Sequence, residues 1–151
     1  MASWAEIAAA EVDFARRVQE RFDLYTHKVI ATLRRDGSPR ISGIEAEFKE
    51  GDIWLGMMPG SLKARDLQRD PRVALHSGTE DPQEGDAMAG RAVDAKVAGR
   101  AVEVPAGGGD MGHRFRIDVT EVVLISVSDP VEHLVIETWR AGGALRRIER
   151  R

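Results

Sequence analysis

The segment from His27 to Met58 alternates apolar and polar residues with a period of two, and this period constrains the fold more than any other feature. Three runs show it, HKVIATLR, PRISGIEAEF and IWLGMM, and the turn signals RDGS and KEGD separate them. Successive side chains of a β-strand point to opposite faces of a sheet, so a period of two predicts strands. Short polar connections that contain glycine predict hairpins between them. The sequence therefore predicts a meander of three antiparallel strands.

Later runs extend this sheet. Four of them, RVALHS, AKVAGRAVEV, FRIDVTEVVLISV and HLVIETWR, have strand-like patterns, while residues 78–92 are polar and glycine-rich and predict a long loop. Gly99 within the fifth run indicates a bend or a close approach of two backbones. The alternation changes phase near Thr120 and Glu121, which indicates a bulge in the sixth run. Six or seven strands at short spacing predict an antiparallel barrel, because closing the sheet removes its exposed edges.

Two helices are expected beside the strands. Apolar residues recur at helical spacing from Trp4 to about Phe22, and Ser3 with Glu6 forms a capping-box pattern in front of them. A second, short helix is expected after the third strand, with Ser61 as its N-cap. The expected organisation is a single domain of residues 1–151, with the N-terminal helix in 1–24, the barrel in 26–140, and a basic tail or one more short strand in 141–151.

The composition excludes several classes of protein. With 151 residues and a formal net charge of −3, the chain is long enough for one domain and lacks the basic excess of a general nucleic-acid-binding protein. No apolar run reaches the roughly 20 residues that a membrane-spanning helix needs, and the N-terminus lacks the basic start of a signal peptide. The absence of cysteine excludes disulfides and thiolate metal sites and is typical of a cytoplasmic protein. The predominance of arginine over lysine, with many alanines and glycines, indicates a GC-rich bacterial genome.

The stretch SLKAR, which opens the second predicted helix, carries the strongest chemical signal. The first amides of a helix have no internal acceptors and lie at the positive end of its dipole. Ser61 adds a hydroxyl, Lys63 a point charge and Arg65 a fork of donors, which together predict a phosphate site. Met57 and Met58 bring polarisable apolar side chains to the same rim, where a flat ring attached to a phosphate would fit. The alternative, an ordinary capped helix with a solvated basic face, stays open.

No other group of residues predicts catalysis or metal binding. The four histidines are not paired at ligand spacing, so no metal site is expected at His27, His76, His113 or His133. Glu45 and Glu47 share one strand face, and they either flank a pocket or lie on a solvated outer face, which strand alternation favours. The sequence assigns no catalytic residue.

The order of these segments resembles the pyridoxamine 5'-phosphate oxidase-like FMN-binding split-barrel family. The residues that carry the resemblance are VIATLRRDGSPRISGIEAEF, then IWLGMMPGSLKARDLQRDPRVAL, then AKVAGRAVEV. They cover about Thr26 to Val104, and the later strands match more loosely. The chain is especially similar to the small actinobacterial flavin- and deazaflavin-dependent reductases of that group. The resemblance implies a six-stranded antiparallel split β-barrel that forms a homodimer, with a cofactor in each of two clefts at the subunit interface.

The resemblance also implies which residues hold the cofactor. By the resemblance, Ser61, Lys63 and Arg65 bind the phosphate. The ring lies along the second and third strands, against Ile41, Ser42, Gly43, Leu55, Met57 and Met58. Trp139, or its neighbour Arg140, reaches the partner's cofactor. Many members of the family carry Asn where this chain has Asp66, so the carboxylate is expected to point away from the phosphate or to pair with Arg65 or Arg69.

The implied function is hydride transfer to an unknown small molecule through bound FMN. A reductase that depends on the deazaflavin coenzyme F420, and a non-catalytic flavin-binding or flavin-sensing protein, are the two alternatives. The cofactor ring carries the chemistry in such enzymes, so the protein need not supply an acid or a base. No second basic cluster that would suit a substrate phosphate is visible, and pyridoxamine phosphate oxidase activity itself is therefore not expected. The short connection PAGGGDMG, where relatives often carry a helix, implies a more open cleft.

Overall fold

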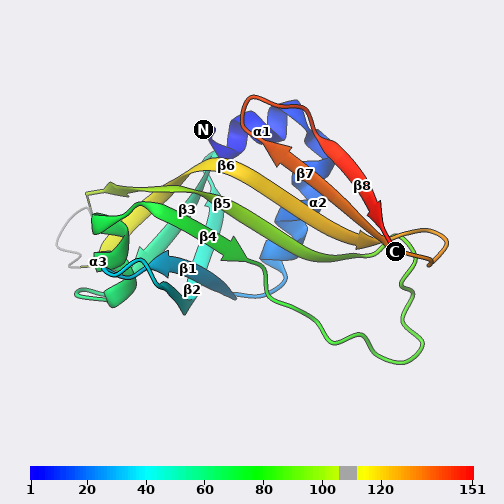
Figure 1. Cartoon of the computed structure of the whole chain (residues 1–151), viewed down its shortest axis with the longest axis horizontal. Coiled ribbons are helices and arrows are strands. Elements are labelled where there is room, and N and C mark those ends of the chain that lie inside the picture. The colour runs from blue at the N-terminus through cyan, green and yellow to red at the C-terminus, as the bar shows by residue number, and fades with distance from the viewer. Residues whose placement is uncertain (106–111) are drawn as a thin grey trace.

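The computed structural model describes residues 1–105 and 112–151, and most of the glycine-rich connection therefore lies outside the described residues. Strands and helices follow the predicted order (Figure 1). The strands are β1 (His27–Leu33), β2 (Pro39–Lys49), β3 (Asp52–Met57), β4 (Arg72–His76), β5 (Ala92–Val104), β6 (His113–Val127), β7 (Leu134–Arg140) and β8 (Arg146–Arg150). The helices are α1 (Trp4–Ala10), α2 (Val12–Asp23) and α3 (Leu62–Arg69).

The strands form one antiparallel sheet that closes on itself. Within the described ranges its order is β3-β2-β1-β4-β5-β6-β7-β8, and an additional pairing of β3 with β6 closes the first six strands into a barrel. β7 and β8 continue the sheet outside this barrel. The predicted six-stranded antiparallel split barrel is thus confirmed. The segment expected as a basic tail holds the extra short strand β8, and all five of its residues are exposed.

The alternation of β2 has the predicted phase. Ile44 and Ala46 point into the barrel and are buried, while Gly43, Glu45 and Glu47 are exposed on its outer face. The interior is filled mainly by aliphatic and aromatic side chains from all sides of the barrel, including Ile30, Ile53, Leu55, Phe115 and Ile117. Burial of these side chains supplies the main driving force for folding.

The predicted N-terminal helix is in fact two helices, α1 and α2, which break at Glu11. A continuous helix would place Glu11 on the apolar stripe between Ile7 and Phe14, both of which are buried. Burying an unpaired carboxylate is costly, and the break keeps Glu11 partly exposed while both helices still cover the sheet. The capping box of Ser3 and Glu6 is confirmed, since the Ser3 hydroxyl accepts from the Glu6 amide and the Glu6 carboxylate accepts from the Ser3 amide. No helix in the described part of the chain has both the length and the apolar character that a membrane span requires.

Gly99 and Thr120 lie at the same irregularity between β5 and β6. Ala98 pairs with Glu121 and Gly99 with Val119, so Thr120 is the extra residue of a bulge. A Cβ atom on Gly99 would overlap the carbonyl oxygen of Asp118 on the facing strand. Both predictions are therefore confirmed, the close backbone approach at Gly99 and the bulge near Thr120. The bulge lies between the part of β6 that pairs with β3, from His113 to Arg116, and the part that pairs with β7, from Glu121 to Val127.

We expect Gly99→Ala to lower the free energy of unfolding by about 1–3 kcal/mol, because the methyl group cannot fit without moving one of two paired backbones. The matched control is Gly43→Ala, where an added Cβ meets nothing within 4 Å. Chemical denaturation of both variants measures the difference. Equal stability of Gly99→Ala and the wild type would show that the two strands are not packed as described.

Candidate functional site

A cleft of 330 Å³ opens where the outer face of β2, the end of β3 and the start of α3 meet. We call it the α3 cleft. It brings together four of the predicted cofactor residues, Gly43, Met57, Met58 and Lys63. The other lining residues are Gly56, within the predicted ring segment from Leu55 to Met58, Glu45, one of two carboxylates considered as flanking a pocket, and His27 and Ile44, which were not predicted. Residues from four elements, β1, β2, β3 and α3, thus line one concave site.

The wall of the α3 cleft is open because of two glycines on adjoining strands. A Cβ atom built on Gly43 of β2 or on Gly56 of β3 would meet nothing within 4 Å. Both residues are exposed, so the flat backbone of the two strands is accessible to a ligand. Met58 extends beside them and is 79% exposed. This wall suits a planar apolar ring better than a bulky one.

A second hollow of 470 Å³ adjoins the α3 cleft and shares Glu45, Gly56, Met57 and Met58 with it. Its far side holds Trp54 of β3 and Arg114 of β6, whose guanidinium carbon lies 3.9 Å from the centre of the indole ring. Such cation–π pairs fix both side chains. The pairing is invisible in the sequence because β3 and β6 meet only when the barrel closes.

The start of α3 is capped as predicted. The Ser61 hydroxyl accepts a hydrogen bond from the Ala64 amide over 3.2 Å. This bond satisfies one of the unpaired amides of the first turn. The amides of Leu62 and Lys63 precede it, at the positive end of the helix dipole. Ser61 thus contributes mainly by holding the helix end in place.

The structure does not bring Lys63 and Arg65 to the same hollow. Lys63 lines the α3 cleft, whereas Arg65 lines a separate hollow on the other flank of α3. Residues two apart on a helix do not face each other. The predicted pair of cations is therefore divided, and only Lys63 faces the cleft.

The remaining predicted residues also lie outside the α3 cleft. Leu55 is fully buried, so its side chain belongs to the barrel interior. Ile41 and Ser42 precede Gly43 on β2, and neither lines the cleft. Trp139 is 7% exposed and packs into the core on β7, opposite Val122. Arg140 pairs with Glu121 on the neighbouring strand.

Asp66 points away from the α3 cleft. Its carboxylate accepts hydrogen bonds from Arg40 Nε (2.7 Å), Thr32 Oγ1 (2.7 Å) and Arg69 Nη2 (3.0 Å). Burial alone would raise the pKa of the Asp66 carboxyl, but these hydrogen bonds outweigh burial and hold the pKa below its ordinary value. The expected pairing with Arg69 is confirmed. Arg40 is the partner that sequence analysis missed, and Arg65 does not take part.

Solved structures share this fold at low sequence identity. A pyridoxamine 5'-phosphate oxidase-related, FMN-binding protein from Nostoc punctiforme is 10% identical, with 93% of this chain and 96% of that chain covered and a TM-score of 0.64. PhzG from Burkholderia lata, solved with tetrahydrophenazine-1-carboxylic acid, is 11% identical, with 97% and 92% covered and a TM-score of 0.65.

A protein of unknown function from Agrobacterium tumefaciens is 15% identical, with 76% of this chain covered and a TM-score of 0.56. That protein is longer, and the match spans only 56% of its length. No protein-family model and no curated protein sequence matches the chain. At these identities the structures show the fold, which is the split barrel of the pyridoxamine 5'-phosphate oxidase-like proteins.

We expect Asp66→Asn to lower the free energy of unfolding by about 1–3 kcal/mol at neutral pH, because two arginines and one hydroxyl lose a charged acceptor. The lowered pKa means that the carboxylate stabilises the fold above its unfolded pKa and loses this effect as the pH falls through the folded pKa. The difference between variant and wild type should therefore shrink as the pH falls below 3.8, the ordinary pKa of an aspartate carboxyl. Denaturation curves across this range measure it.

Asp81→Asn is the matched control, since Asp81 is exposed and its carboxylate has no partner among the described residues. It should change stability little at any pH. A constant difference between Asp66→Asn and the wild type at all pH values would contradict the assigned ion pairs.

Proposed function

We propose that the chain binds FMN in the α3 cleft, as a homodimer, and uses it to oxidise or reduce a small molecule. The observation that carries this proposal is the junction of an open, two-glycine strand wall with Lys63 at the start of α3. A planar ring and a phosphate need these two features side by side. The split-barrel fold, shared with an FMN-binding protein, supports the same reading.

The ring would lie against the strand wall. Gly43 and Gly56 leave space for it, and Met57 and Met58 supply apolar, polarisable contacts along one side. Exposed backbone groups of β2 can hydrogen-bond the polar edge of the ring. The residues present therefore fit a flavin-sized planar group.

The phosphate would lie at the start of α3. Lys63 faces the cleft, and the Leu62 and Lys63 amides lie at the positive end of the helix. A helix N-terminus with an adjacent cation is a favourable place for a phosphate. Asp66, the nearest carboxylate on the helix, is held on the opposite flank by Arg40 and Arg69. These two ion pairs neutralise the charge of Asp66, so the carboxylate does not repel a phosphate at the start of α3.

A bound flavin supplies the hydride chemistry. The chain's own part is to bind the ring, to orient it and to exclude water from the covered face. His27 and Glu45 are titratable and line the cleft, but the proposal assigns neither of them a catalytic step. The absence of cysteine supports a cytoplasmic setting.

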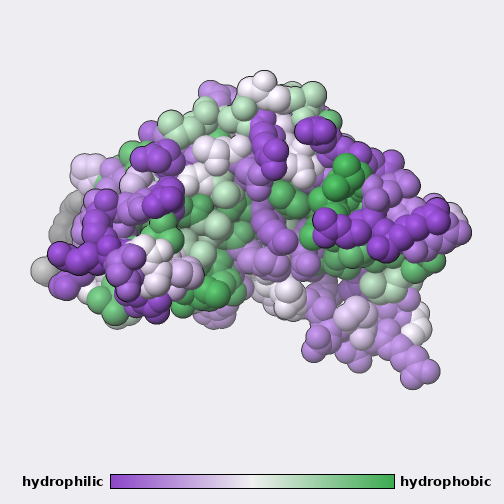
Figure 2. All heavy atoms as spheres, viewed as in Figure 1, coloured by the Kyte–Doolittle hydropathy of each residue, from purple (hydrophilic) through white to green (hydrophobic). Residues whose placement is uncertain are grey.

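The dimer would form on the outer face of β1 and β2. Val29 and Ala31 pair with Gly43 and Ile41 across these strands, and Ile41 is 75% exposed. Apolar atoms gather on this side of the molecule near α3 (Figure 2). The face adjoins the α3 cleft at Gly43, so a second copy seated there would also cover the ring site. Exposed apolar patches of this kind mark interaction surfaces.

The deazaflavin coenzyme F420 is the main alternative cofactor, since it also combines a planar ring with a phosphate. A mass spectrum of the small molecules that co-purify identifies the ligand directly. Yellow protein with flavin absorbance supports FMN, and colourless protein that binds added F420 supports the deazaflavin. Protein that binds a flavin but turns over no electron donor supports a storage or sensing role.

We expect Lys63→Ala to weaken FMN binding by roughly 10- to 100-fold, the loss of one charge-assisted hydrogen bond. Riboflavin, which lacks the phosphate, should bind equally to the variant and the wild type. Arg65→Ala is the matched control, because Arg65 faces the other flank of α3. Fluorescence titration measures the affinity of the wild type and both variants for FMN, and of the wild type and Lys63→Ala for riboflavin. Unchanged FMN affinity in Lys63→Ala, or an equal loss in Arg65→Ala, would refute this phosphate position.

We expect Ile41→Asp to convert the dimer into a monomer at micromolar concentration, because it places a charge in the centre of the apolar face. Val12→Asp, at a position on α2 that is 70% exposed, is the control and should leave the oligomeric state unchanged. Light scattering after size exclusion measures the mass. A wild-type monomer would rule out the proposed interface.

A further inference from the structure

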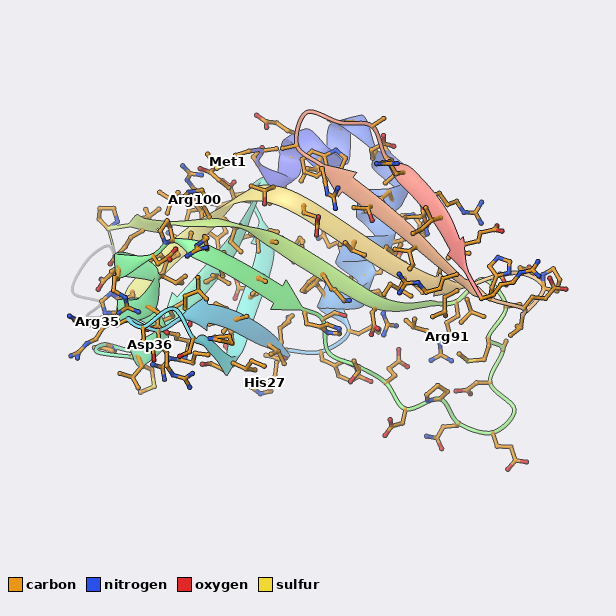
Figure 3. The ribbon with its side chains drawn as sticks, viewed as in Figure 1. Met1, His27, Arg35, Asp36, Arg91 and Arg100 are labelled. Carbon is orange, nitrogen blue, oxygen red and sulfur yellow. The ribbon has the colours of Figure 1, made fainter. Side chains whose placement is uncertain are left out.

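Five arginines surround one hollow of 440 Å³ on the flank of α3 that faces away from the α3 cleft. We call it the arginine hollow. The turn between β1 and β2 contributes two of them, the start of β2 one and α3 two, and the lining is Arg34, Arg35, Arg40, Arg65 and Arg69, with Asp36, Leu62 and Asp66. Arg35 and Asp36 mark this end of the molecule in Figure 3. Sequence analysis found no second basic cluster, and the fold assembles one.

The charge of the arginine hollow is opposite to that of the protein. Five arginines against two aspartates leave a formal charge of +3 in the lining, whereas the whole chain carries −3. A concave site lined by one sign of charge concentrates ions of the other sign. The net charge of the protein repels anions, so any attraction of an anion to the hollow comes from the arginines that line it.

Two of the arginines are held in place by an ion pair with Asp66. Arg40 and Arg69 have side chains that are 21% and 33% exposed, and both bind Asp66, whose side chain is 4% exposed. Arg40 uses its Nε for this bond, and its two terminal nitrogens have no partner among the described residues. Arg69 also donates to the Leu33 carbonyl over 2.6 Å. Asp66 thus orients the guanidinium of Arg40 and leaves its donor fork available.

Two further arginines are free. The guanidinium groups of Arg35 and Arg65 have no hydrogen-bond or ion-pair partner within residues 1–105 and 112–151, and both residues are exposed. The nearby Asp36 does not pair with them, because its carboxylate accepts from the amide and the hydroxyl of Ser38. These hydrogen bonds lower the pKa of the Asp36 carboxyl. The open side of the hollow therefore presents unpaired guanidinium groups.

We propose that the arginine hollow binds a small anion with two or more adjacent phosphate groups, separately from the cofactor in the α3 cleft. A guanidinium binds a phosphate through two parallel hydrogen bonds. The hollow offers three donor forks, from Arg35, Arg40 and Arg65, and two adjacent phosphate groups present more acceptor oxygens to these forks than one phosphate does. Its volume also exceeds that of one phosphate group. A pyrophosphate or longer oligophosphate chain matches both the charge and the number of donors.

The test is calorimetric titration of the folded chain with pyrophosphate and, separately, with inorganic phosphate. The proposal predicts that pyrophosphate binds at least about tenfold more tightly than phosphate. Arg35→Gln combined with Arg65→Gln should reduce pyrophosphate affinity by about tenfold or more, the effect of losing charged hydrogen bonds. Arg146→Gln combined with Arg147→Gln removes the same charge from the exposed strand β8 and should have little effect.

Lys63→Ala separates this site from the α3 cleft. It should leave pyrophosphate affinity unchanged, so the result does not depend on whether FMN binds. The proposal is overturned if the wild type does not bind pyrophosphate at millimolar concentration, if both double variants lose affinity equally, or if Lys63→Ala alone abolishes binding. Tighter binding of a short single-stranded oligonucleotide than of pyrophosphate, with the same dependence on Arg35 and Arg65, would overturn it in favour of nucleic acid.

Discussion

The pairing of β3 with β6 is the contact on which the rest of the structure depends. It joins Trp54 to Arg116 and Met57 to His113, and it pairs the otherwise free edge of β3 so that the first six strands form a closed barrel. The closure buries Leu55 and Phe115 against each other's strands in the interior. It also fixes the end of β3, so Met58 and the start of α3 lie beside the outer face of β2. Without this closure the part of the α3 cleft wall that β3 forms would not be fixed in place.

The short helix α3 separates two sites of different character. On one flank Lys63 faces a cleft whose wall is made open by Gly43 and Gly56. On the other flank Arg65 joins the arginines of the β1–β2 turn and of β2. Asp66 belongs to the second flank, where its hydrogen bonds to Arg40, Thr32 and Arg69 tie α3 to β1 and β2. The helix is held to the barrel by a buried carboxylate as well as by the apolar contacts of Ala64 and Leu67.

This arrangement changes the meaning of the basic residues in the stretch SLKAR. As a linear pattern it indicates one anion site that uses hydroxyl, ammonium and guanidinium together. In the folded chain the Ser61 hydroxyl caps the helix, Lys63 faces the ring site, and Arg65 faces the arginine hollow. The carboxylate at position 66, which is unfavourable beside a phosphate, is compatible with one because it is paired elsewhere.

Local patterns predicted much of the fold. The strands β1 to β3, the bulge at Thr120, the close approach at Gly99 and the cap at Ser61 follow from short-range periodicity and turn chemistry. The break at Glu11 was missed, because the acid occupies a position that helical spacing alone marks as part of the apolar stripe. Of the cofactor residues, Gly43, Met57, Met58 and Lys63 meet in one cleft. Leu55 and Trp139, which were also predicted to contact the cofactor, lie in the hydrophobic core. Burying a large apolar side chain stabilises the fold more than leaving it exposed at the rim of a cleft.

The sequence by itself determined the succession of strands and helices along the chain, the hairpins that join β1 to β2 and β2 to β3, and the position of α3, because each depends on neighbours a few residues apart. Only the tertiary structure decided which charges share a hollow. Trp54 and Arg114 are distant in sequence, and the pairing of β3 with β6 brings them together. Arg35 and Arg65 are also distant in sequence, and the packing of α3 against β1 brings them to one hollow. Helix geometry separated charges that are close in sequence, because residues two apart on a helix point in different directions and Lys63 and Arg65 therefore lie on opposite flanks of α3. Side-chain periodicity fixes local structure, whereas the assembly of a site depends on which surfaces the closed sheet places next to each other.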